Sequence, residues 1–406
     1  MNYNFDLMTT RRGSHCVKWD ECADSEIIPL WVADMDFEVA PAITEALRRR
    51  VEHKIFGYAI VEDSYYDAVI NWYSRRHHWD IKREWIVYTT GVVPAVSAVL
   101  QALTMPGEKV VVMTPVYNCF FSSIRNSGCQ VEESPLLKVE HDDQMTYRVD
   151  WQDFERRCAD EKTTVFLLCN PHNPACRVWT RDELAKMADI CARHNVTVVS
   201  DEIHCELVMP GYEFTPFALS YLHSSNISTP QPPILGGNNP KFVICCSPSK
   251  SFNTAGLQMA NIICPDSEMR RRIDRAVNIN ETCDVNPFAP LAVEAAYNEG
   301  EEWLDQLNLY IHENYKALCK FFSENLPQMK VYKLEGTYLA WVDVSATGLS
   351  TTELCEKLIK EGKVWVCNGT IYGEKDGEGF IRINMACQRE RLMEGLRRIK
   401  KVLDSL

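Results

Sequence analysis

A lysine with reactive potential lies at residues 247–251 (SPSKS), directly after the apolar run 242–246. An amine that condenses with an aldehyde must lose its proton at times, which a partly buried lysine beside a cationic ring can do. Open α/β sheets collect their ligands at the ends of strands, where Lys250 would lie. Taken alone, Lys250 is interpreted equally well as a surface lysine in a turn.

Asp201 is a carboxylate that ends another apolar run, residues 196–200 (VTVVS). At the C-terminal end of a strand it could pair with a cationic ring, and such a ring is an electron sink that stabilises a carbanion. The alternative is an aspartate that caps the next turn. Asp201 and Lys250 together therefore indicate carbanion chemistry on an aldehyde cofactor.

Two backbone features also follow apolar runs. The turn at residues 170–174 (NPHNP) contains two prolines, which would hold the amide of Asn173 at the edge of the sheet. Gly91, Val92 and Val93 open a helix whose free N–H groups and positive dipole end could bind a phosphate. An ordinary turn and an ordinary helix start are the alternatives.

Two further side chains gain meaning from the others. Tyr117 follows another run and could stack on a flat ring, although it could equally be a core tyrosine. Arg382 suits bidentate binding of a carboxylate, whereas an arginine in a strand is more often in a surface ion pair. Five candidate groups follow predicted strands in chain order, an arrangement that chance would seldom produce: Gly91, Tyr117, Asn173, Asp201 and Lys250.

Seven short apolar runs predict the strands that position these groups. Most are continuous, as expected of strands covered on both faces, and helical patterns alternate with them. We therefore predict an α/β fold with a mostly parallel, seven-stranded sheet. The strands are predicted at 85–89, 109–113, 130–133, 164–169, 196–200, 242–246 and 258–264.

Changes in pattern along the chain predict its organisation. Thr180 and Glu183 form a capping box, and Pro94 lies in the first turn of the helix that follows Gly91. After about residue 290, long amphipathic helices predominate, the last with an apolar stripe through Leu392 and Leu396. The predicted units are an N-terminal segment, 1–50, that joins the small domain; a large cofactor domain, 51–290; and a small α+β domain, 291–406. Residues 223–240 predict an exposed loop.

The composition restricts the partners. The chain has 406 residues and a net charge of −13, and no cluster of basic residues with interleaved aromatics, so nucleic acid is not expected. The N-terminus has no signal-peptide pattern, and no stretch approaches eighteen apolar residues, so a cytoplasmic protein without a membrane span is expected. Its 17 cysteines, with no C-x-x-C pair, predict reduced core residues and no metal site rather than a disulfide or metal framework.

Residues 247–257 (SPSKSFNTAGL) resemble the fold-type I enzymes that use pyridoxal 5′-phosphate (PLP). The resemblance implies that Lys250 carries the cofactor as a Schiff base and that Asp201 pairs with its pyridine nitrogen. Asn173 would then donate to the phenolate oxygen of the cofactor. The other implied roles are ring stacking for Tyr117, substrate carboxylate binding for Arg382, and phosphate binding for Gly91, Val92, Val93, Ser247 and Ser249.

The resemblance is closest to the PatB/MalY-type cystathionine β-lyases (C-S lyases), and the matches span nearly the whole chain: 31–37 (WVADMDF), 57–58 (GY), 84–87 (EWIV), 170–179 (NPHNPACRVW), 201–204 (DEIH) and 336–339 (GTYL). It implies a homodimer in which Tyr58 reaches the phosphate of the neighbouring subunit's cofactor. It also implies that Ala33 contacts the substrate and that His204 contacts the cofactor. At the position of His204, related aminotransferases usually have a tyrosine.

The chain departs from the family pattern at a few positions. Cys176 stands where the family usually has glycine, which puts the conformation of its loop in question because other residues resist a positive φ. Thr90 and Gln388 stand where proline is common. Gln258 occupies the place of a phosphate-binding arginine in many aminotransferases, but glutamine is common in the lyases.

The resemblance predicts β-elimination of a thiol from cystathionine or another cysteine S-conjugate, with Lys250 removing the Cα proton. The products would be a thiol, pyruvate and ammonia. An aminotransferase is the main alternative, because the same groups serve both reactions. A regulatory protein on this fold is a third possibility, although the intact Lys250 argues against an inactive enzyme.

Overall fold

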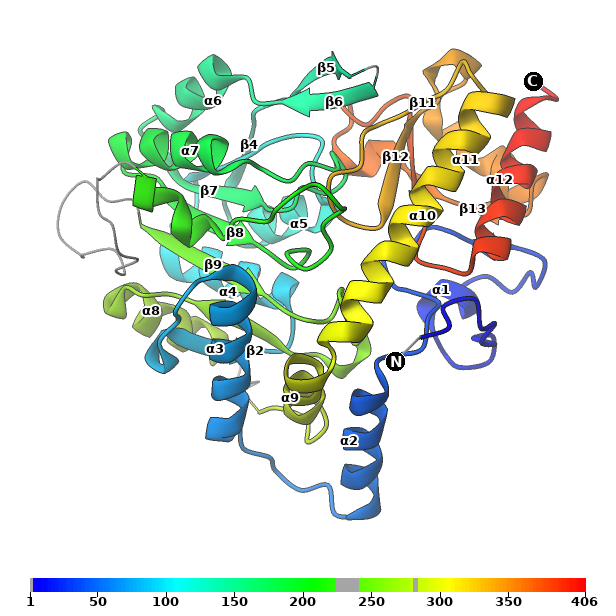
Figure 1. Cartoon of the computed structure of the whole chain (residues 1–406). Coiled ribbons are helices and arrows are strands. Elements are labelled where there is room, and N and C mark those ends of the chain that lie inside the picture. The colour runs from blue at the N-terminus through cyan, green and yellow to red at the C-terminus, as the bar shows by residue number, and fades with distance from the viewer. Residues whose placement is uncertain (1–2, 143, 224–240, 280–283) are drawn as a thin grey trace.

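One sheet of seven strands dominates the computed structural model, which describes residues 3–142, 144–223, 241–279 and 284–406 (Figure 1). The strand order is β2-β10-β9-β8-β7-β3-β4, and only β10 runs antiparallel to its neighbours. All seven predicted strands are confirmed: β2 (Ile86–Thr89), β3 (Lys109–Val112), β4 (Gln130–Glu133), β7 (Thr163–Cys169), β8 (Thr197–Asp201), β9 (Phe242–Cys246) and β10 (Ala260–Ile263).

Helices cover both faces of this sheet, which explains why its strands are apolar without alternation. Side chains of one face, such as Val110 and Leu167, pack with α4 (Val92–Leu103), α5 (Asn118–Asn126) and α8 (Ser267–Val277). Alternate side chains pack into a larger core on the other face. That core includes residues of α2 (Pro41–Glu52), α3 (Asp63–His77), α6 (Trp151–Cys158), α7 (Arg181–Arg193) and α9 (Ala289–Glu299).

Two helix starts match their sequence signals. Thr180 and Glu183 form the predicted capping box of α7: the Thr180 hydroxyl accepts from the Glu183 N–H at 3.2 Å, and the Glu183 carboxylate accepts from the Thr180 N–H at 2.9 Å. Helix α4 begins directly after Gly91, with Pro94 in its first turn. The first N–H groups of α4 therefore point to the end of the sheet where Lys250 and Asp201 lie.

The C-terminal part contains a second, smaller sheet of β11 (Lys330–Val331), β12 (Leu339–Asp343), β15 (Phe380–Asn384) and β14 (Cys367–Asn368). Its helices are α10 (Glu301–Asn325), α11 (Thr351–Lys360) and α12 (Arg389–Leu403), and α12 buries its apolar stripe. Helix α10 runs from α9 to this sheet (Figure 1).

The N-terminal segment pairs with the C-terminal part, because β1 (Ile28–Pro29) lies parallel to β13 (Val364–Trp365). The remaining α-helix is α1 (Val17–Asp20), and the remaining strands, β5 (Leu137–His141) and β6 (Gln144–Arg148), form a hairpin. The division at residues 50 and 290 stays a prediction. The loop predicted at 223–240 lies, apart from its first residue, outside the described residues.

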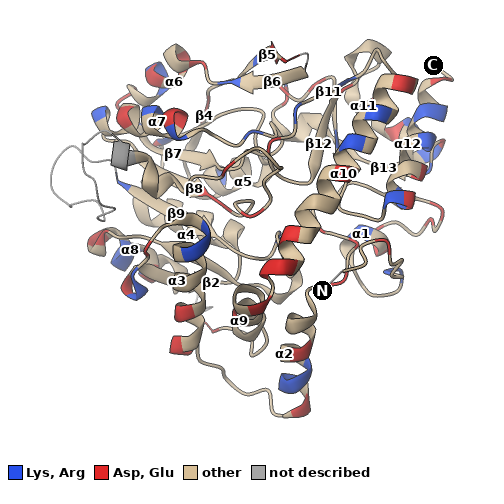
Figure 2. Ribbon diagram, viewed as in Figure 1, with Lys and Arg blue, Asp and Glu red and all other residues tan. Residues whose placement is uncertain are grey.

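The surface charges agree with the absence of a basic stripe in the sequence. In Figure 2, both basic and acidic residues occur on α7, α8 and α12. The cysteines in the described ranges are all free, and most are buried, as the sequence predicts. Of the helices that the structure describes, none is both long enough and apolar enough to cross a membrane.

Candidate active site

A cavity of about 190 Å³ opens at the C-terminal ends of the parallel strands. Parallel strands end at the same edge of a sheet, so the loops that follow β2, β3, β7, β8 and β9 meet there. Ten residues singled out in the sequence line this cavity: Ala33, Gly91, Val92, Val93, Tyr117, Asn173, Asp201, His204, Ser249 and Lys250. Tyr58, Ser247 and Arg382 do not line it.

Lys250 is held by a backbone oxygen. Its Nζ donates to the carbonyl of Ala33 at 2.6 Å, and the hydroxyl of Tyr338 donates to the same carbonyl at 3.0 Å. Burial, and after it the positive charge of Arg382, lowers the pKa of Lys250. A lysine with a lowered pKa reaches the neutral, nucleophilic form more readily than a surface lysine.

Buried charges anchor the segment that provides this carbonyl. Arg11 forms ion pairs with Asp34 at 2.8 Å and with Asp36 at 2.9 Å. Lys18, whose side chain is fully buried, adds an ion pair to Asp36 at 3.2 Å. Asp34 follows Ala33 directly and Asp36 lies three residues after it, so these pairs restrain the position of the Ala33 carbonyl relative to Lys250.

Asp201 lies at the last position of β8 with few partners. Its carboxylate accepts from the Ile203 N–H at 3.0 Å, and no ion pair joins it to a cation within the described ranges. Burial raises its pKa to about 7. A cation placed beside Asp201 would lower that pKa and stabilise the carboxylate, so this site favours a positively charged ligand.

His204 follows Asp201 on the same loop and lines the cavity. Burial lowers its pKa to about 3, so the ring is neutral at pH 7. Its Nδ1 is buried and has no hydrogen-bond partner among the residues that the structure describes. An unpartnered buried nitrogen is costly unless a ligand or water satisfies it, so His204 is suited to contact a polar group in the cavity.

Arg382 reaches the site from the smaller sheet. It lies on β15, is 3% exposed, and its guanidinium donates to Asn173 Oδ1 at 3.1 Å and to the Trp31 carbonyl at 3.0 Å. No carboxylate forms an ion pair with it in the part of the chain that the structure describes, and its Nε has no partner. A buried guanidinium without a carboxylate can bind one from a ligand.

Two predicted residues lie differently. The Ser247 hydroxyl donates to the Met259 carbonyl at 2.6 Å and accepts from the Ser249 N–H at 3.0 Å. It therefore holds the turn that carries Lys250, and its predicted contact with phosphate stays a prediction. Tyr58 is 97% exposed, in the connection between α2 and α3, and does not join the other candidate residues of its own chain.

The question about Cys176 has a clear outcome. The residue adopts a φ of 62°, as glycine would, and its side chain is fully buried. Its sulfur lies 3.1 Å from the Pro174 carbonyl and 3.3 Å from the Leu339 carbonyl. The loop therefore keeps its left-handed turn despite the substitution, and contacts of the thiol offset part of the strain.

We expect Cys176→Gly to be more stable than Cys176→Ala, by about 1 kcal/mol, because alanine keeps the left-handed strain and loses the sulfur contacts. Chemical denaturation of both variants measures the difference. As a control, the same pair of substitutions at Cys191, buried in α7 where φ is helical, should give the opposite order. An alanine variant at 176 as stable as the glycine variant would contradict the strain.

Sequence reasoning gave no role to several lining residues: Pro94, Cys169, Ile203, Ala255 and Met259. Each is uncharged and lies within or beside a stretch that the sequence analysis singled out, so only that neighbourhood could have indicated it. Thr90 and Gln258 also line the cavity, and both stood out as departures from the family pattern. Tyr338 lies in a matched motif, but only the structure places its hydroxyl on the Ala33 carbonyl.

The family model described as aminotransferase class I and II matches residues 25–399. The chain therefore belongs to the aminotransferase class I and II family, and it has the fold of its fold-type I members. It is 42% identical over 404 residues to cystathionine beta-lyase PatB of Bacillus subtilis (strain 168), covering 98% of this chain and 100% of that protein.

Two other similarities span the chain. Protein MalY of Escherichia coli (strain K12) is 32% identical over 400 residues, which cover 97% of each chain. The crystal structure of cystalysin from Treponema denticola, which contains a pyridoxal 5′-phosphate cofactor, aligns with a TM-score of 0.91 at 34% identity and covers 100% of both chains. These similarities agree with the family that the sequence motifs indicate.

Proposed function

We propose that the chain is a PLP-dependent carbon–sulfur β-lyase that cleaves L-cystathionine or a related cysteine S-conjugate to a thiol, pyruvate and ammonia. The observation that carries this proposal is the partly buried Lys250, which shares one cavity with Asp201 and Asn173. The 42% identity to a cystathionine beta-lyase supports the choice of reaction.

The cavity fits PLP by its donors and acceptors. Lys250 would hold the aldehyde carbon, and Asp201 supplies the anion that the protonated ring nitrogen needs. His204 Nδ1 and Asn173 are placed for polar atoms of the ring, and the first N–H groups of α4 with Ser249 suit the phosphate. When bound, PLP withdraws electrons from the substrate Cα, so that its proton becomes acidic.

The chain's own residues would do the remaining work. Arg382 binds the α-carboxylate of the substrate, and the hydrogen bond from Arg382 to Asn173 orients its guanidinium. Nζ of Lys250 would accept the Cα proton of the bound substrate. The Cβ–S bond then breaks and the sulfur leaves as a thiolate. Hydrolysis of the resulting aminoacrylate yields pyruvate and ammonia.

A substrate panel tests this function. The purified protein, loaded with PLP, is incubated with cystathionine, cysteine, cystine and other cysteine S-conjugates while pyruvate and free thiol are measured. We expect both products without any added keto acid. The proposal would be wrong if no member of the panel released a thiol.

An aminotransferase is the second candidate, because the family includes aminotransferases and the residues of the cavity serve both reactions. Transamination differs from β-elimination in two ways: a proton returns to the substrate-derived adduct in place of the loss of a thiolate, and a keto acid is needed as acceptor of the amino group. Amino-group transfer to a keto acid that clearly exceeds thiol release in the same panel would favour the aminotransferase.

Removing the carboxylate contact should affect substrate binding. We expect Arg382→Ala to raise KM for cystathionine by about 30-fold or more, the equivalent of about 2 kcal/mol for a hydrogen bond to a charged group. Steady-state kinetics measure it, and Arg397→Ala, whose side chain on α12 is 57% exposed, is the control. An analogue without the α-carboxylate should react equally poorly with wild type and Arg382→Ala; a clear difference would remove this role.

We also propose a homodimer. The connection between α2 and α3 exposes apolar side chains at Ile55, Phe56 and Ile60, beside the exposed Tyr58. Such a run is costly in water, and a second copy of the chain would cover it. Tyr58 of one subunit would then bind the cofactor phosphate of the other.

Mixing two inactive variants tests the shared site. Tyr58→Ala lacks the contact made to the partner, and Lys250→Ala lacks the group used within its own subunit. We expect the mixture to regain activity, since a hybrid dimer contains one site with both groups. Native mass spectrometry confirms that subunits exchange. Exchange without any gain in activity would contradict the contribution of Tyr58.

The cysteine content suggests the cellular compartment of the enzyme. We place it in the cytoplasm, because its free cysteines persist in a reducing compartment. Residues 51–290 would form the large cofactor domain, and 291–406 the small domain that 1–50 joins. A loss of labelled thiols after mild oxidation of the purified protein would support the reducing environment, since such thiols stay free only where they are kept reduced.

A further inference from the structure

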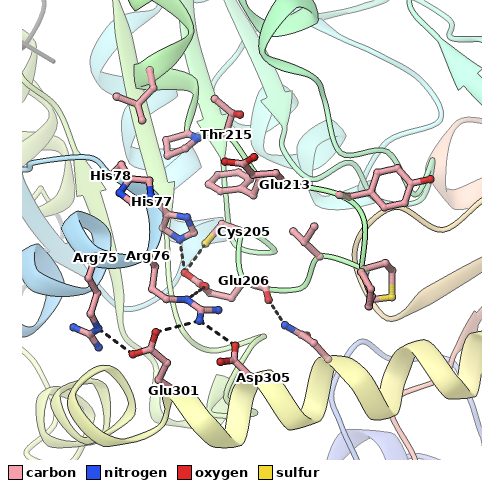
Figure 3. A pocket seen from close by; sticks show the side chains of 18 of the residues that line it. Arg75, Arg76, His77, His78, Cys205, Glu206, Glu213, Thr215, Glu301 and Asp305 are labelled. Carbon is pink, nitrogen blue, oxygen red and sulfur yellow. Dashed lines mark hydrogen bonds and ion pairs between the residues drawn. The ribbon is translucent and has the colours of Figure 1, made fainter. Parts of the chain in front are cut away.

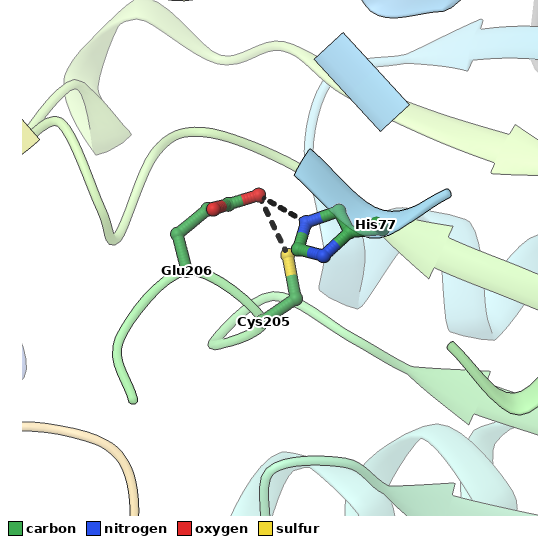
Figure 4. Close-up of side chains that lie close together, drawn as sticks. All are labelled: His77, Cys205 and Glu206. Carbon is green, nitrogen blue, oxygen red and sulfur yellow. Dashed lines mark hydrogen bonds and ion pairs between the residues drawn. The ribbon is translucent and has the colours of Figure 1, made fainter. Parts of the chain in front are cut away.

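Three side chains of different chemistry meet outside the PLP cavity: His77 at the end of α3, and Cys205 and Glu206 on the loop after β8 (Figure 4). His77 Nε2 lies 2.6 Å from Glu206 Oε1, and Cys205 Sγ lies 3.7 Å from the same oxygen. One atom from each residue lies within 4.8 Å of the others. Cys205 and Glu206 are buried.

Nitrogen, sulfur and carboxylate oxygen together are the ligand set of zinc rather than of magnesium or calcium, which prefer oxygen alone. Around a tetrahedral zinc ion such atoms lie about 3.3–3.7 Å apart. The sulfur and the carboxylate already have that spacing. The imidazole and the carboxylate must separate by about 1 Å, which requires their hydrogen bond to be replaced by two bonds to the ion.

The surroundings of Glu206 suit a metal ligand. Trp72 Nε1 donates to Glu206 Oε1 at 2.6 Å and thereby orients the carboxylate. Arg76 lies 3.8 Å from its other oxygen, but Arg76 also pairs with Glu301 at 3.1 Å and with Asp305 at 3.0 Å (Figure 3). Arg76 therefore stays neutralised when Glu206 binds a cation.

A cation can reach this cluster from solvent. All three side chains line a cavity of about 940 Å³ between the end of α3, the loop after β8 and the start of α10 (Figure 3). None of them lines the smaller cavity that contains Lys250. A tetrahedral ion would take its fourth ligand, a water molecule, from the larger cavity.

We propose that His77, Cys205 and Glu206 bind one Zn²⁺ ion in the wall of this larger cavity. On binding, the S–H bond of Cys205 breaks, a sulfur–zinc bond forms and the proton leaves to solvent. His77 binds through the lone pair of Nε2 with its proton on Nδ1. The ion joins α3 to the loop that carries His204, and so stiffens one wall of the PLP cavity.

The cluster without a metal would be a hydrogen-bonded pair of His77 and Glu206 beside a thiol. The two alternatives differ in stoichiometry and in spectrum. The PLP-loaded protein is treated with a chelator, desalted and dialysed against Zn²⁺, and bound metal is measured by mass spectrometry. We expect one tightly bound equivalent and a higher melting temperature with zinc; a melting temperature that zinc leaves unchanged would contradict the proposal.

Cobalt makes the ligands visible. Co²⁺ in a tetrahedral site with a thiolate gives strong ligand-field bands at longer wavelength than the absorbance of the cofactor. We expect these bands in the wild type and in Cys319→Ser, a control that removes a partly buried thiol on α10. We expect none in Cys205→Ser, with zinc affinity lowered at least about tenfold, because even outer partners of a metal contribute about 10–100-fold.

A second variant guards against a folding defect. Glu206→Gln keeps the shape of the side chain and an oxygen for Trp72, and it should also weaken zinc binding while the far-ultraviolet spectrum stays native. Equal zinc affinity in wild type, Cys205→Ser and Glu206→Gln would overturn the proposal. These measurements do not use lyase activity, so their outcome is independent of the proposed reaction.

Discussion

Lys250→Ala is expected to lower cystathionine cleavage by about 10³-fold or more, because one side chain supplies both the covalent anchor and the base for the Cα proton. The visible absorbance of the lysine-bound cofactor should disappear as well. Pyruvate formation at saturating PLP and an absorbance spectrum measure the two effects.

The control for Lys250→Ala is a lysine without contact to the cavity. Lys320, on α10, has a side chain that is 74% exposed, and Lys320→Ala should behave as the wild type does. Lys250→Arg keeps a positive charge but cannot condense with an aldehyde, so it should be as inactive as the alanine variant. Wild-type turnover in either Lys250 variant would exclude the proposed mechanism.

The second large effect is expected for Asp201→Asn. The change keeps the shape of the side chain and removes the negative charge that stabilises a protonated ring, so kcat should fall by about 10²–10³-fold. Cofactor should still bind to Lys250. The comparison of kcat with the visible spectrum at saturating PLP separates the loss of chemistry from the loss of cofactor.

The neighbouring acid provides a matched control. Glu202 is also buried, and burial raises its pKa to about 8, so it is mostly uncharged at pH 7. Its Oε1 accepts from the Ser200 hydroxyl at 2.9 Å and from the Phe217 N–H at 2.8 Å, and it does not line the cavity. Glu202→Gln should therefore keep kcat within about twofold, since no charge is lost. Similar losses in both variants would mean that charge at Asp201 is not the cause.

The sheet and the edge residues were predictable because local patterns determine them. Continuous apolar runs gave all seven strands, and parallel strands necessarily bring their C-terminal ends together. Asp201, Asn173 and Lys250 each follow such a run, so their meeting in one cavity needed no long-range information.

Contacts between distant segments were not predictable in this way. The Ala33 carbonyl holds Lys250 across 217 positions, and backbone atoms leave no signal in residue types. The partner of Ser247, the left-handed turn of Cys176 and the meeting of His77 with Glu206 likewise depend on tertiary packing. The sequence predicted a mostly parallel sheet, but it did not indicate that β10 is the strand that runs antiparallel.

The hydrogen bond from Lys250 to a main-chain oxygen has an evolutionary consequence. A substitution at position 33 leaves its carbonyl in place, so natural variation cannot delete this acceptor by changing that residue. Only a shift of the backbone can alter it, and the ion pairs of Arg11 and Lys18 with Asp36 restrain that shift. Evolution can therefore change the reactivity of the amine through charged residues that do not contact a ligand. We expect differences in rate among homologous enzymes to follow substitutions at those positions.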